Sequence, residues 1–424
     1  MIKSIFKQIR NQKRSNVWIS IELLLVFIIV WFLADASFLL VYNSCLTDTR
    51  NIDNAWQVNI AEYPDSYARY SADESTEEAR AANFERVLQT LRSYPGVEAV
   101  AIVSADAEPE SGSFSGIGMT SIDDTTRMIA GQRISTDPRG DYFRAFGYVD
   151  RNGKPVSVQD FDVTVPKGVI IGQLEADYFF PDGRAVGREL RGRDKTDLYR
   201  VIGVVGSIKN AFMGSLGRYQ STFYMFPARS SNRFTVRMNK SVLESFKKDM
   251  NERLQIGNFY LKNVVPYNRL SELSKDMQGL SSIINIGVSL MIFFLLNILL
   301  CVMGTFWYRI NTRREEIGLR KALGSSSAGV RNSLILEGLC LLTIAMVPAM
   351  LIEYQFVYAG MTMTKIGGGM GPDLMEYLPD RQNLRFLITN GITWAIMAAV
   401  IAVAIVIPAQ KAASLPPAEA LHYE

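Results

Sequence analysis

The sequence has almost no histidine and little cysteine, and common catalytic motifs are missing. Its single histidine is His422, which excludes histidine-based catalysis and multi-histidine metal sites. The three cysteines, Cys45, Cys301 and Cys340, show no spacing typical of a disulfide framework. The motifs G-x-x-x-x-G-K-[ST], H-E-x-x-H, G-x-S-x-G and CxxC are absent. We therefore expect no catalytic, cofactor-binding or metal-binding residue on this chain.

A strong excess of one charge is missing as well. The 45 Lys and Arg residues against 42 Asp and Glu residues give a formal net charge of +3. No global basic field indicates nucleic acid as a partner. The acids of the polar middle region could in principle supply a glycosidase pair. Such a pair cannot be distinguished from the many acids of an ordinary soluble surface, so we reject the hydrolase interpretation.

Four long apolar stretches are present in the 424-residue chain. A membrane-spanning helix needs roughly 20 apolar residues. The first stretch, dominated by LLLVFIIVWFLA, is too long for a signal peptide and has no small-residue cleavage site after it, so we interpret it as an uncleaved anchor. The predicted transmembrane helices are residues 17–43, 281–308, 332–357 and 386–408.

The distribution of basic residues predicts the orientation of these helices. Residues 1–16 carry five basic residues and no acid, and the loop 309–331 holds six basic residues against two acids. Short loops rich in Lys and Arg stay in the cytoplasm. We therefore expect both of these segments and the tail 409–424 inside, and residues 44–279 and the loop 358–385 outside.

The region between the first two spans has the pattern of a soluble domain. Short apolar runs (AVAIV, GVIIGQ, YRVIGVVG and FTVRM) alternate with turn residues and predict strands, whereas residues 77–94 and 241–255 predict helices. Apolar residues at helical spacing over 268–280 predict a helix that runs directly into the second span. The predicted fold is an α-helical membrane protein with four transmembrane helices and a large α+β extracytoplasmic domain between the first and second.

The loop 309–331 contains a distinctive charged segment, RREEIGLRKALG, at residues 313–324. It predicts a short amphipathic helix in which Glu316 pairs with Arg320 at i,i+4, and Ile317 and Leu323 are apolar anchors. Gly324 suits a left-handed C-terminal stop. The residues leave two interpretations open. The segment is either a helix at the membrane interface or a helix that docks into a partner.

Polar residues within the spans are further candidates. A charge at the position of Asp35 costs roughly 2.5–3.5 kcal/mol on insertion scales. Asp35 is either a proton site or interhelical contact, with Asn285 or Asn297 as its partner, or an outer-leaflet acid that stays solvated. The intramembrane candidates are Asp35, Asn285, Asn297 and Glu337. We interpret the remaining acids of the spans, and Glu337 itself, as interfacial acids: Glu22, Glu337 and Glu353.

Several of these segments resemble one family. RREEIGLRKALG, followed by a span that carries Glu337 in LILEGL, closely resembles the signature of MacB/FtsX-type permeases. The tail IPAQKAASLPPAEALHYE is similar to the ending of that family. DYFRAFGYVDRNGKPVS, VIIGQLEADYFFPDGRAVGRELRG, YRVIGVVGSIKN and TFYMFP resemble its periplasmic core domain in order and spacing. The resemblance covers essentially the whole chain, including the order of one span, a large domain and three spans.

The resemblance implies a permease subunit of an ABC transporter, not an enzyme, in the inner (cytoplasmic) membrane with both termini in the cytoplasm. Its implied partners are two copies of a cytoplasmic ABC ATPase, which would hold ATP and Mg, a second permease subunit in a homodimer or heterodimer, and the lipid membrane. A periplasmic adaptor or an outer-membrane channel is a further candidate partner. We expect no cofactor on this chain and no nucleic acid.

The implied mechanism is mechanotransmission, in which ATP hydrolysis moves the extracytoplasmic domain through a stalk to export or extract a periplasmic or membrane-derived substrate. The stalk corresponds to the helix beyond Tyr42 and to residues 268–280. The ATPase-coupling helix corresponds to Arg313, Arg314, Glu315, Glu316, Ile317, Gly318, Leu319, Arg320, Lys321, Leu323 and Gly324. The alternative is an FtsX-like regulator that activates a cell-wall hydrolase, although relatives of that kind usually have a smaller outer domain.

Two departures from the family pattern affect these expectations. MacB itself carries its ATPase ahead of the first span, where this sequence has only a short basic segment, so we expect a stand-alone permease. The first span also lacks the glycines common in the family and holds Glu22 and Asp35 instead. Close helix packing at the first span is therefore not expected.

Overall fold

The computed structural model describes residues 13–104, 107–109, 115–193, 196–209, 219–226, 233–277, 279–312, 317–319, 322–359 and 381–414. The chain divides into two compact units. One, here called the membrane unit, combines the described parts of Met1–Tyr42, Ser281–Gly367 and Tyr377–Glu424. The other, here called the inserted domain, comprises the described parts of Asn43–Leu280.

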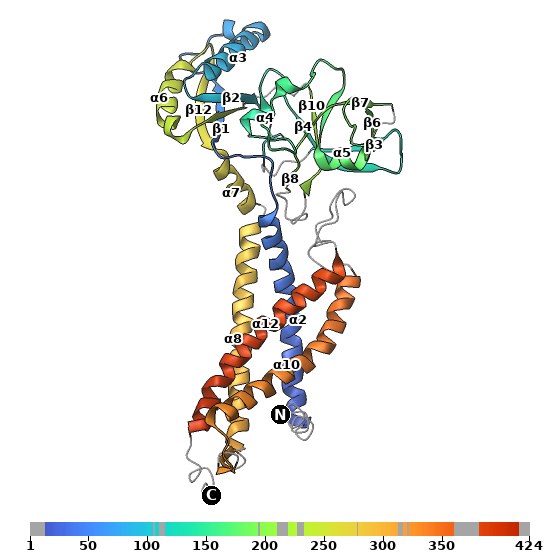
Figure 1. Cartoon of the computed structure of the whole chain (residues 1–424). Coiled ribbons are helices and arrows are strands. Elements are labelled where there is room, and N and C mark those ends of the chain that lie inside the picture. Colours follow the sequence, from blue (N-terminus) through green and yellow to red (C-terminus); the bar gives the residue numbers. More distant parts are fainter. Residues whose placement is uncertain are drawn as a thin grey trace. The chain divides into compact units, whose positions relative to one another are not determined.

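The membrane unit contains four helices that are long and apolar enough to cross a membrane, as the sequence predicted. The third begins earlier than the predicted span because Ser326 caps it, its Oγ accepting a hydrogen bond of 3.1 Å from the Gly329 N–H. The helices are α2 (Lys13–Cys45), α8 (Leu280–Thr312), α10 (Ser327–Tyr358) and α12 (Gln382–Ser414) (Figure 1).

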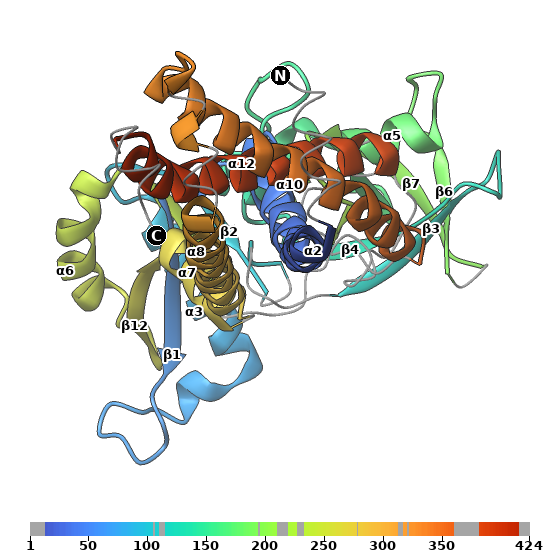
Figure 2. The ribbon, with the colours of Figure 1, turned by 90° about the horizontal axis from the view of Figure 1, so that it is seen from below.

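Helices α10 and α12 pack closely as a pair and cross α2 and α8 obliquely (Figures 1 and 2). Gly338 permits this approach, because a Cβ there would lie 2.4 Å from Cδ1 of Ile405 and 3.0 Å from Cγ2 of Ile401. One apolar core joins residues from all four helices. Helix α8 contributes Ile298, Val302 and Phe306 to it but leaves most of its apolar surface uncovered in this single chain.

One part of the inserted domain is a four-stranded antiparallel sheet of order β12-β1-β11-β2. Its core contains Trp56 and Val58 of the sheet with Leu88 and Phe246 of the helices. Thr76 caps the helix Glu77–Arg92 by accepting a hydrogen bond from the Ala79 N–H. The elements are β1 (Ala55–Glu62), η1 (Asp73–Ser75), α3 (Glu77–Arg92), β2 (Val97–Ile102), β11 (Arg233–Met238), η4 (Lys240–Val242), α6 (Leu243–Arg253) and β12 (Phe259–Pro266).

The second part of the domain is a closed barrel of order β10-β4-β3-β6-β7-β5. The sequence did not predict this closure. Two of its pairs, β10 with β4 and β5 with β7, are parallel. The elements are β3 (Gly116–Ser121), β4 (Met128–Ser135), α4 (Tyr142–Ala145), η2 (Val158–Asp160), β5 (Gly168–Gly172), α5 (Gln173–Phe179), β6 (Glu189–Gly192), β7 (Leu198–Val205), β8 (Ile208–Lys209), β9 (Tyr219–Gln220) and β10 (Thr222–Met225).

Buried aromatic rings connect the sheet to the barrel. Tyr142 and Phe143 of α4 pack against Tyr148 and against Tyr224 of β10 in a single cluster that also includes Ala101 of β2. The Tyr142 hydroxyl donates to the Ala107 carbonyl at 2.7 Å. The two parts therefore share one core, as expected of a single domain.

The helix after β12 differs from its prediction. Helix α7 (Tyr267–Met277) occupies most of the predicted helical stripe but does not continue directly into α8. Gly279 has a φ of +73°, in the left-handed region that glycine adopts without strain. The chain therefore turns at Gly279 before α8 begins at Leu280.

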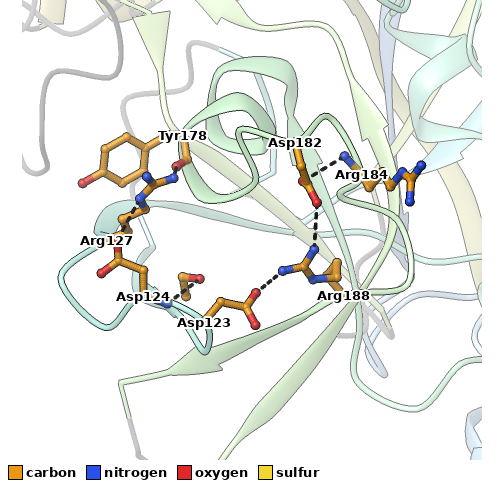
Figure 3. A network of polar contacts seen from close by, with 8 residues as sticks. Asp123, Asp124, Arg127, Tyr178, Asp182, Arg184 and Arg188 are labelled. Carbon is orange, nitrogen blue, oxygen red and sulfur yellow. Dashed lines mark hydrogen bonds and ion pairs between the residues drawn. The ribbon is translucent and has the colours of Figure 1, made fainter.

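A network of surface ion pairs ties the β3–β4 turn to the segment after α5 (Figure 3). Arg188 binds Asp123 and also Asp182, the latter at 3.1 Å. Arg127 binds Asp124 at 3.1 Å and donates to the Tyr178 carbonyl at 2.8 Å. These groups are partly or fully exposed, so each pair stabilises the fold only slightly and the network serves to position two loops.

Glu175 is a buried carboxyl at the end of the barrel where β5 leads into α5. It lies back over Gly172, where a Cβ would come within 2.1 Å of its Oε2. Burial raises the pKa of Glu175 from 4.5 to about 7, although hydrogen bonds from its own backbone, Ser221 and Thr222 oppose the shift. The folded domain therefore holds a proton that the unfolded chain releases more readily.

This proton makes stability depend on pH. Because the folded-state pKa is raised, the native state binds more protons between pH 4.5 and about 7, so stability falls as pH rises through that window. Glu175→Gln should remove this fall and leave the domain more stable above pH 7, by at most about 3 kcal/mol.

Hydrogen exchange of β5 and β10 in the full chain, corrected for intrinsic rates, measures the effect. Glu189→Gln, which changes a half-buried acid on β6 that pairs with Arg200, is the control. An equal pH dependence in wild type and Glu175→Gln would contradict the assignment.

Candidate functional site

The buried charges of the membrane unit define its candidate site. Among its described residues, five charged side chains are buried: Asp35, Arg309, Glu337, Glu353 and Arg385. A charge removed from water is tolerated in a protein only when it is paired or neutralised. The partners of these five groups therefore show what holds the four helices together.

Asp35 of α2 forms a bidentate ion pair with Arg385 of α12. The Arg385 Nε donates to Oδ1 of Asp35 at 2.8 Å and Nη2 donates to Oδ2 at 2.7 Å. Asp35 is only 3% exposed, so the expectation of a solvated outer-leaflet acid is wrong. The proposed contact with Asn285 or Asn297 is also wrong, because both amides lie on the exposed surface of α8.

Trp31 reinforces the same contact. Its indole N–H donates to Oγ1 of Thr389 at 3.0 Å, and its ring packs edge-on against Phe386 at a centroid distance of 5.9 Å. Both partners lie on α12, within one turn of Arg385. This end of the unit, where α2 ends and α12 begins, is here called the proximal end because the inserted domain follows α2 in the sequence.

A second buried ion pair joins α8 to α10 at the opposite, distal end. Nη1 of Arg309 lies 3.1 Å from Oε1 of Glu337, and the Arg309 guanidinium also covers the Phe306 ring at 5.6 Å. Glu337 is 3% exposed and is therefore buried among the helices, whereas its position near the membrane interface stays a prediction. Glu22 of α2 accepts a hydrogen bond from the Cys301 thiol of α8 at 2.7 Å, which adds a further polar link between helices.

Glu353 on α10 is the third buried acid of the membrane unit, and its position near the membrane interface stays a prediction. Its side chain is fully buried, with an exposed fraction of 0%. Neither carboxyl oxygen has a hydrogen-bond partner among the residues that the structure describes.

The predicted coupling helix is described in part. Residues 317–319 and 322 are helical, the Leu323 N–H donates to the Leu319 carbonyl at 3.0 Å, and Gly324 has the expected left-handed φ of +96°. The predicted Glu316–Arg320 pair lies outside the described residues, as do Arg313, Arg314, Glu315 and Lys321.

The apolar side chains of this segment are divided between two environments. Ile317 is buried in the membrane unit's own core, so its predicted role as an anchor on a partner is wrong. Leu319 and Leu323 are 53% and 80% exposed. An exposed leucine pair beside basic residues is a surface that a protein partner could cover.

Among the described residues, no group of three or more His, Cys, Asp or Glu side chains could hold a metal ion. The membrane unit thus combines two buried ion pairs, here called clamps, with an exposed loop segment. Asp35–Arg385 lies at the proximal end and Arg309–Glu337 at the distal end. This arrangement is suited to holding helices in register and to contacting a partner.

Comparisons with known proteins agree with this architecture. The model of the MacB-like periplasmic core domain matches residues 36–253, half of the chain, and the model of the FtsX-like permease C-terminal region matches residues 288–417. The chain therefore belongs to the MacB/FtsX-type permease family. It is a transporter component with transmembrane helices and a periplasmic core-type domain. No curated protein matches the chain.

Three solved structures each match about half of this chain. The extracellular domain of the noncanonic ABC-type transporter YknZ from Gram-positive bacteria is 13% identical, with a TM-score of 0.28, and the match covers 49% of this chain and 100% of that one. The periplasmic region of MacB from Actinobacillus actinomycetemcomitans is 13% identical, with a TM-score of 0.28 and coverages of 52% and 92%. A domain of a putative permease protein from Porphyromonas gingivalis is 14% identical, with a TM-score of 0.27 and coverages of 53% and 97%.

The sequence signal for these clamps was incomplete. Asp35 and Glu337 were recognisable as acids in apolar runs, but Arg385 and Arg309 sit at the predicted span boundaries and were assigned to loops. A basic residue at the end of one span and an acid within another is the signal that could have identified each pair.

We expect removal of one member of the Asp35–Arg385 pair to lower the stability of the membrane unit much more than replacement of both members by apolar residues. Arg385→Met or Asp35→Leu alone leaves an uncompensated buried charge and should destabilise the membrane unit by about 3–5 kcal/mol. The double variant removes both charges and should recover most of that loss.

Thermal unfolding of the full chain in detergent measures the effect, with Arg381→Met, an exposed arginine just before α12, as the control. Single variants as stable as wild type, or a double variant as unstable as the sum of the two, would show that the pair is not a clamp.

Proposed function

We propose that this chain is the permease subunit of an ABC transporter and couples ATP hydrolysis by a separate cytoplasmic ATPase to movement of its inserted domain. Membership of the MacB/FtsX-type family supports an ABC ATPase partner. The exposed Leu319 and Leu323 in the segment that resembles the family's coupling helix carry the proposal. The distribution of basic residues supports a cytoplasmic position for this segment, with both termini inside.

The ion pairs suggest how movement at one end would reach the other. The segment that includes Leu319 and Leu323 lies between α8 and α10, and the Arg309–Glu337 pair locks those helices together close to it. At the proximal end the Asp35–Arg385 pair holds α12 to α2, which leads into the inserted domain. Helices that are clamped by buried charges move as rigid elements, because sliding would expose or separate the charges.

A second permease copy is part of the proposal. Helix α8 leaves Asn285, Asn297 and a broad apolar surface uncovered. Exposed amides on a spanning helix favour hydrogen bonding to another helix over contact with lipid. Two copies, identical or related, would bind two ATPase subunits. The substrate would be exported or extracted from the periplasm or the membrane.

The central test is a pull-down of the ATPase with the tagged permease. Leu323→Asp places a charge in the proposed desolvated contact and should lower ATPase recovery at least tenfold, equivalent to about 1.4 kcal/mol. Expression and membrane insertion should not change, since Leu323 does not belong to the core.

Two further variants separate the explanations. Ser325→Asp adds the same charge to the same loop without removing an apolar contact, and should leave recovery near that of wild type. Ile317→Ala should lower thermal stability instead of selectively releasing the ATPase. Normal ATPase recovery with Leu323→Asp would remove the coupling role from this segment.

One observation favours the alternative function, an FtsX-like regulator that grips another protein. A groove of about 500 Å³ lies beside β2, the edge strand of the sheet, and is lined by Arg92, Arg139 and Arg144. Glu98 pairs with Arg237, and Asp141 accepts hydrogen bonds from Ser157 and two backbone N–H groups. Among the described residues no carboxylate pairs with Arg92 or Arg144, so the groove suits an acidic segment of a partner protein.

Charge reversal distinguishes this role from ATPase coupling. Arg92→Glu with Arg144→Glu should reduce capture of an acidic extracytoplasmic protein at least tenfold and leave ATPase recovery unchanged. Arg86→Glu, another exposed arginine on α3, is the control. If capture is insensitive to the paired reversal, the groove has no part in binding.

A further inference from the structure

The buried charges of the membrane unit do not balance. Its described residues include three buried acids but only two buried arginines. Arg385 is bound to Asp35 and Arg309 is bound to Glu337. The acid that remains is Glu353, fully buried, with both oxygens lacking a hydrogen-bond partner.

Among the described residues, the polar side chain that contacts Glu353 is the Asn390 amide on the facing helix α12. Nδ2 of Asn390 donates to the Phe386 carbonyl at 3.0 Å, whereas its Oδ1 has no partner. An amide oxygen can only accept a hydrogen bond, and an ionised carboxylate can only accept as well. Two acceptors without a donor therefore face a shared buried site.

The charged groups described on the neighbouring elements do not supply a donor to Glu353 or to Oδ1 of Asn390. On α12, Arg385 donates hydrogen bonds from Nε and Nη2 to Asp35 of α2. The buried cation of α8 is Arg309, at the distal end with Glu337. On α10 itself the adjacent titratable group, Tyr354, is exposed, and its hydroxyl donates to Asn383 at 3.4 Å. An ionised Glu353 would thus be an unpaired buried charge, which costs far more than neutralisation.

We propose that Glu353 is a proton-binding site of the membrane unit, held as a neutral carboxylic acid whose O–H donates to Oδ1 of Asn390. One proton provides a donor for Oδ1 of Asn390 and balances the buried charges. The site lies on α10 between its core-forming stretch and its C-terminal end, and it links α10 to α12 without a salt bridge. The inference does not depend on the ATPase partner.

The same site is a modification site for hydrophobic carbodiimides, which react with protonated carboxyls. The carboxyl oxygen adds to the carbodiimide carbon and the acid proton moves to a carbodiimide nitrogen. The resulting O-acylisourea rearranges to an N-acylurea by acyl transfer, with no group lost. Asp35 and Glu337 are each bound to a buried arginine and are expected to stay unmodified.

Infrared spectroscopy of the full chain in lipid nanodiscs tests the proposal directly. In a Glu175→Gln background, which removes the other buried carboxyl that holds a proton, the spectrum should contain the carbonyl stretch of a protonated carboxylic acid that disappears when Glu353→Gln is added. Gln is the neutral isostere of a protonated Glu. The variant should therefore fold, and its thermal unfolding temperature should equal that of wild type. Glu78→Gln, which changes an exposed acid on α3, is the control and should retain the band. A spectrum unchanged by Glu353→Gln, with carboxylate bands lost instead, would show that Glu353 is ionised.

Labelling with dicyclohexylcarbodiimide, followed by peptide mass spectrometry, provides an independent readout. Modification of Glu353 should exceed that of Asp35 and Glu337 at least tenfold. Equal or greater labelling of Asp35 or Glu337 would overturn the assignment of the proton, since those acids would then be the neutral ones.

Discussion

The structure of the membrane unit depends on one constraint, that a charge buried away from water must be paired or neutralised. Asp35 with Arg385 and Arg309 with Glu337 satisfy it by bringing residues of different helices together. The two pairs lie at opposite ends of the four-helix unit and link α2 to α12 and α8 to α10. Apolar packing alone is weakly directional, whereas these contacts fix which helices are neighbours and in what register.

Function follows from where these fixed contacts lie relative to the surfaces that remain uncovered. The segment between α8 and α10 exposes Leu319 and Leu323, and α8 has two amides on its exposed face. Ile317 belongs to the core and joins the segment to the helices instead of to a partner. A partner that displaces this segment would therefore act on the clamped helices as a body.

The architecture could be predicted from the sequence, but the long-range contacts could not. Hydropathy predicted four helices, and alternation predicted β2, β5, β7 and β11, because burial of one face leaves a periodic pattern in the residues. Closure of the barrel depends on pairings between distant strands, for which local pattern carries no signal. The partner of Asp35 lies 350 residues away in the chain, and Arg385 reads as a loop residue when its neighbours in space are unknown. The break at Gly279 depends on its positive φ, which its identity permits but does not require.

The most direct measurement of the central claim is the distance between a spin label on the inserted domain and one on the membrane unit during ATP turnover by the partner ATPase. Leu273 on α7 and Tyr358 at the end of α10 are exposed and suitable for labelling. If the chain transmits movement, the distance distribution should shift between nucleotide-free and ATP-bound states and return after hydrolysis. An unchanged distribution while the complex hydrolyses ATP would contradict the account.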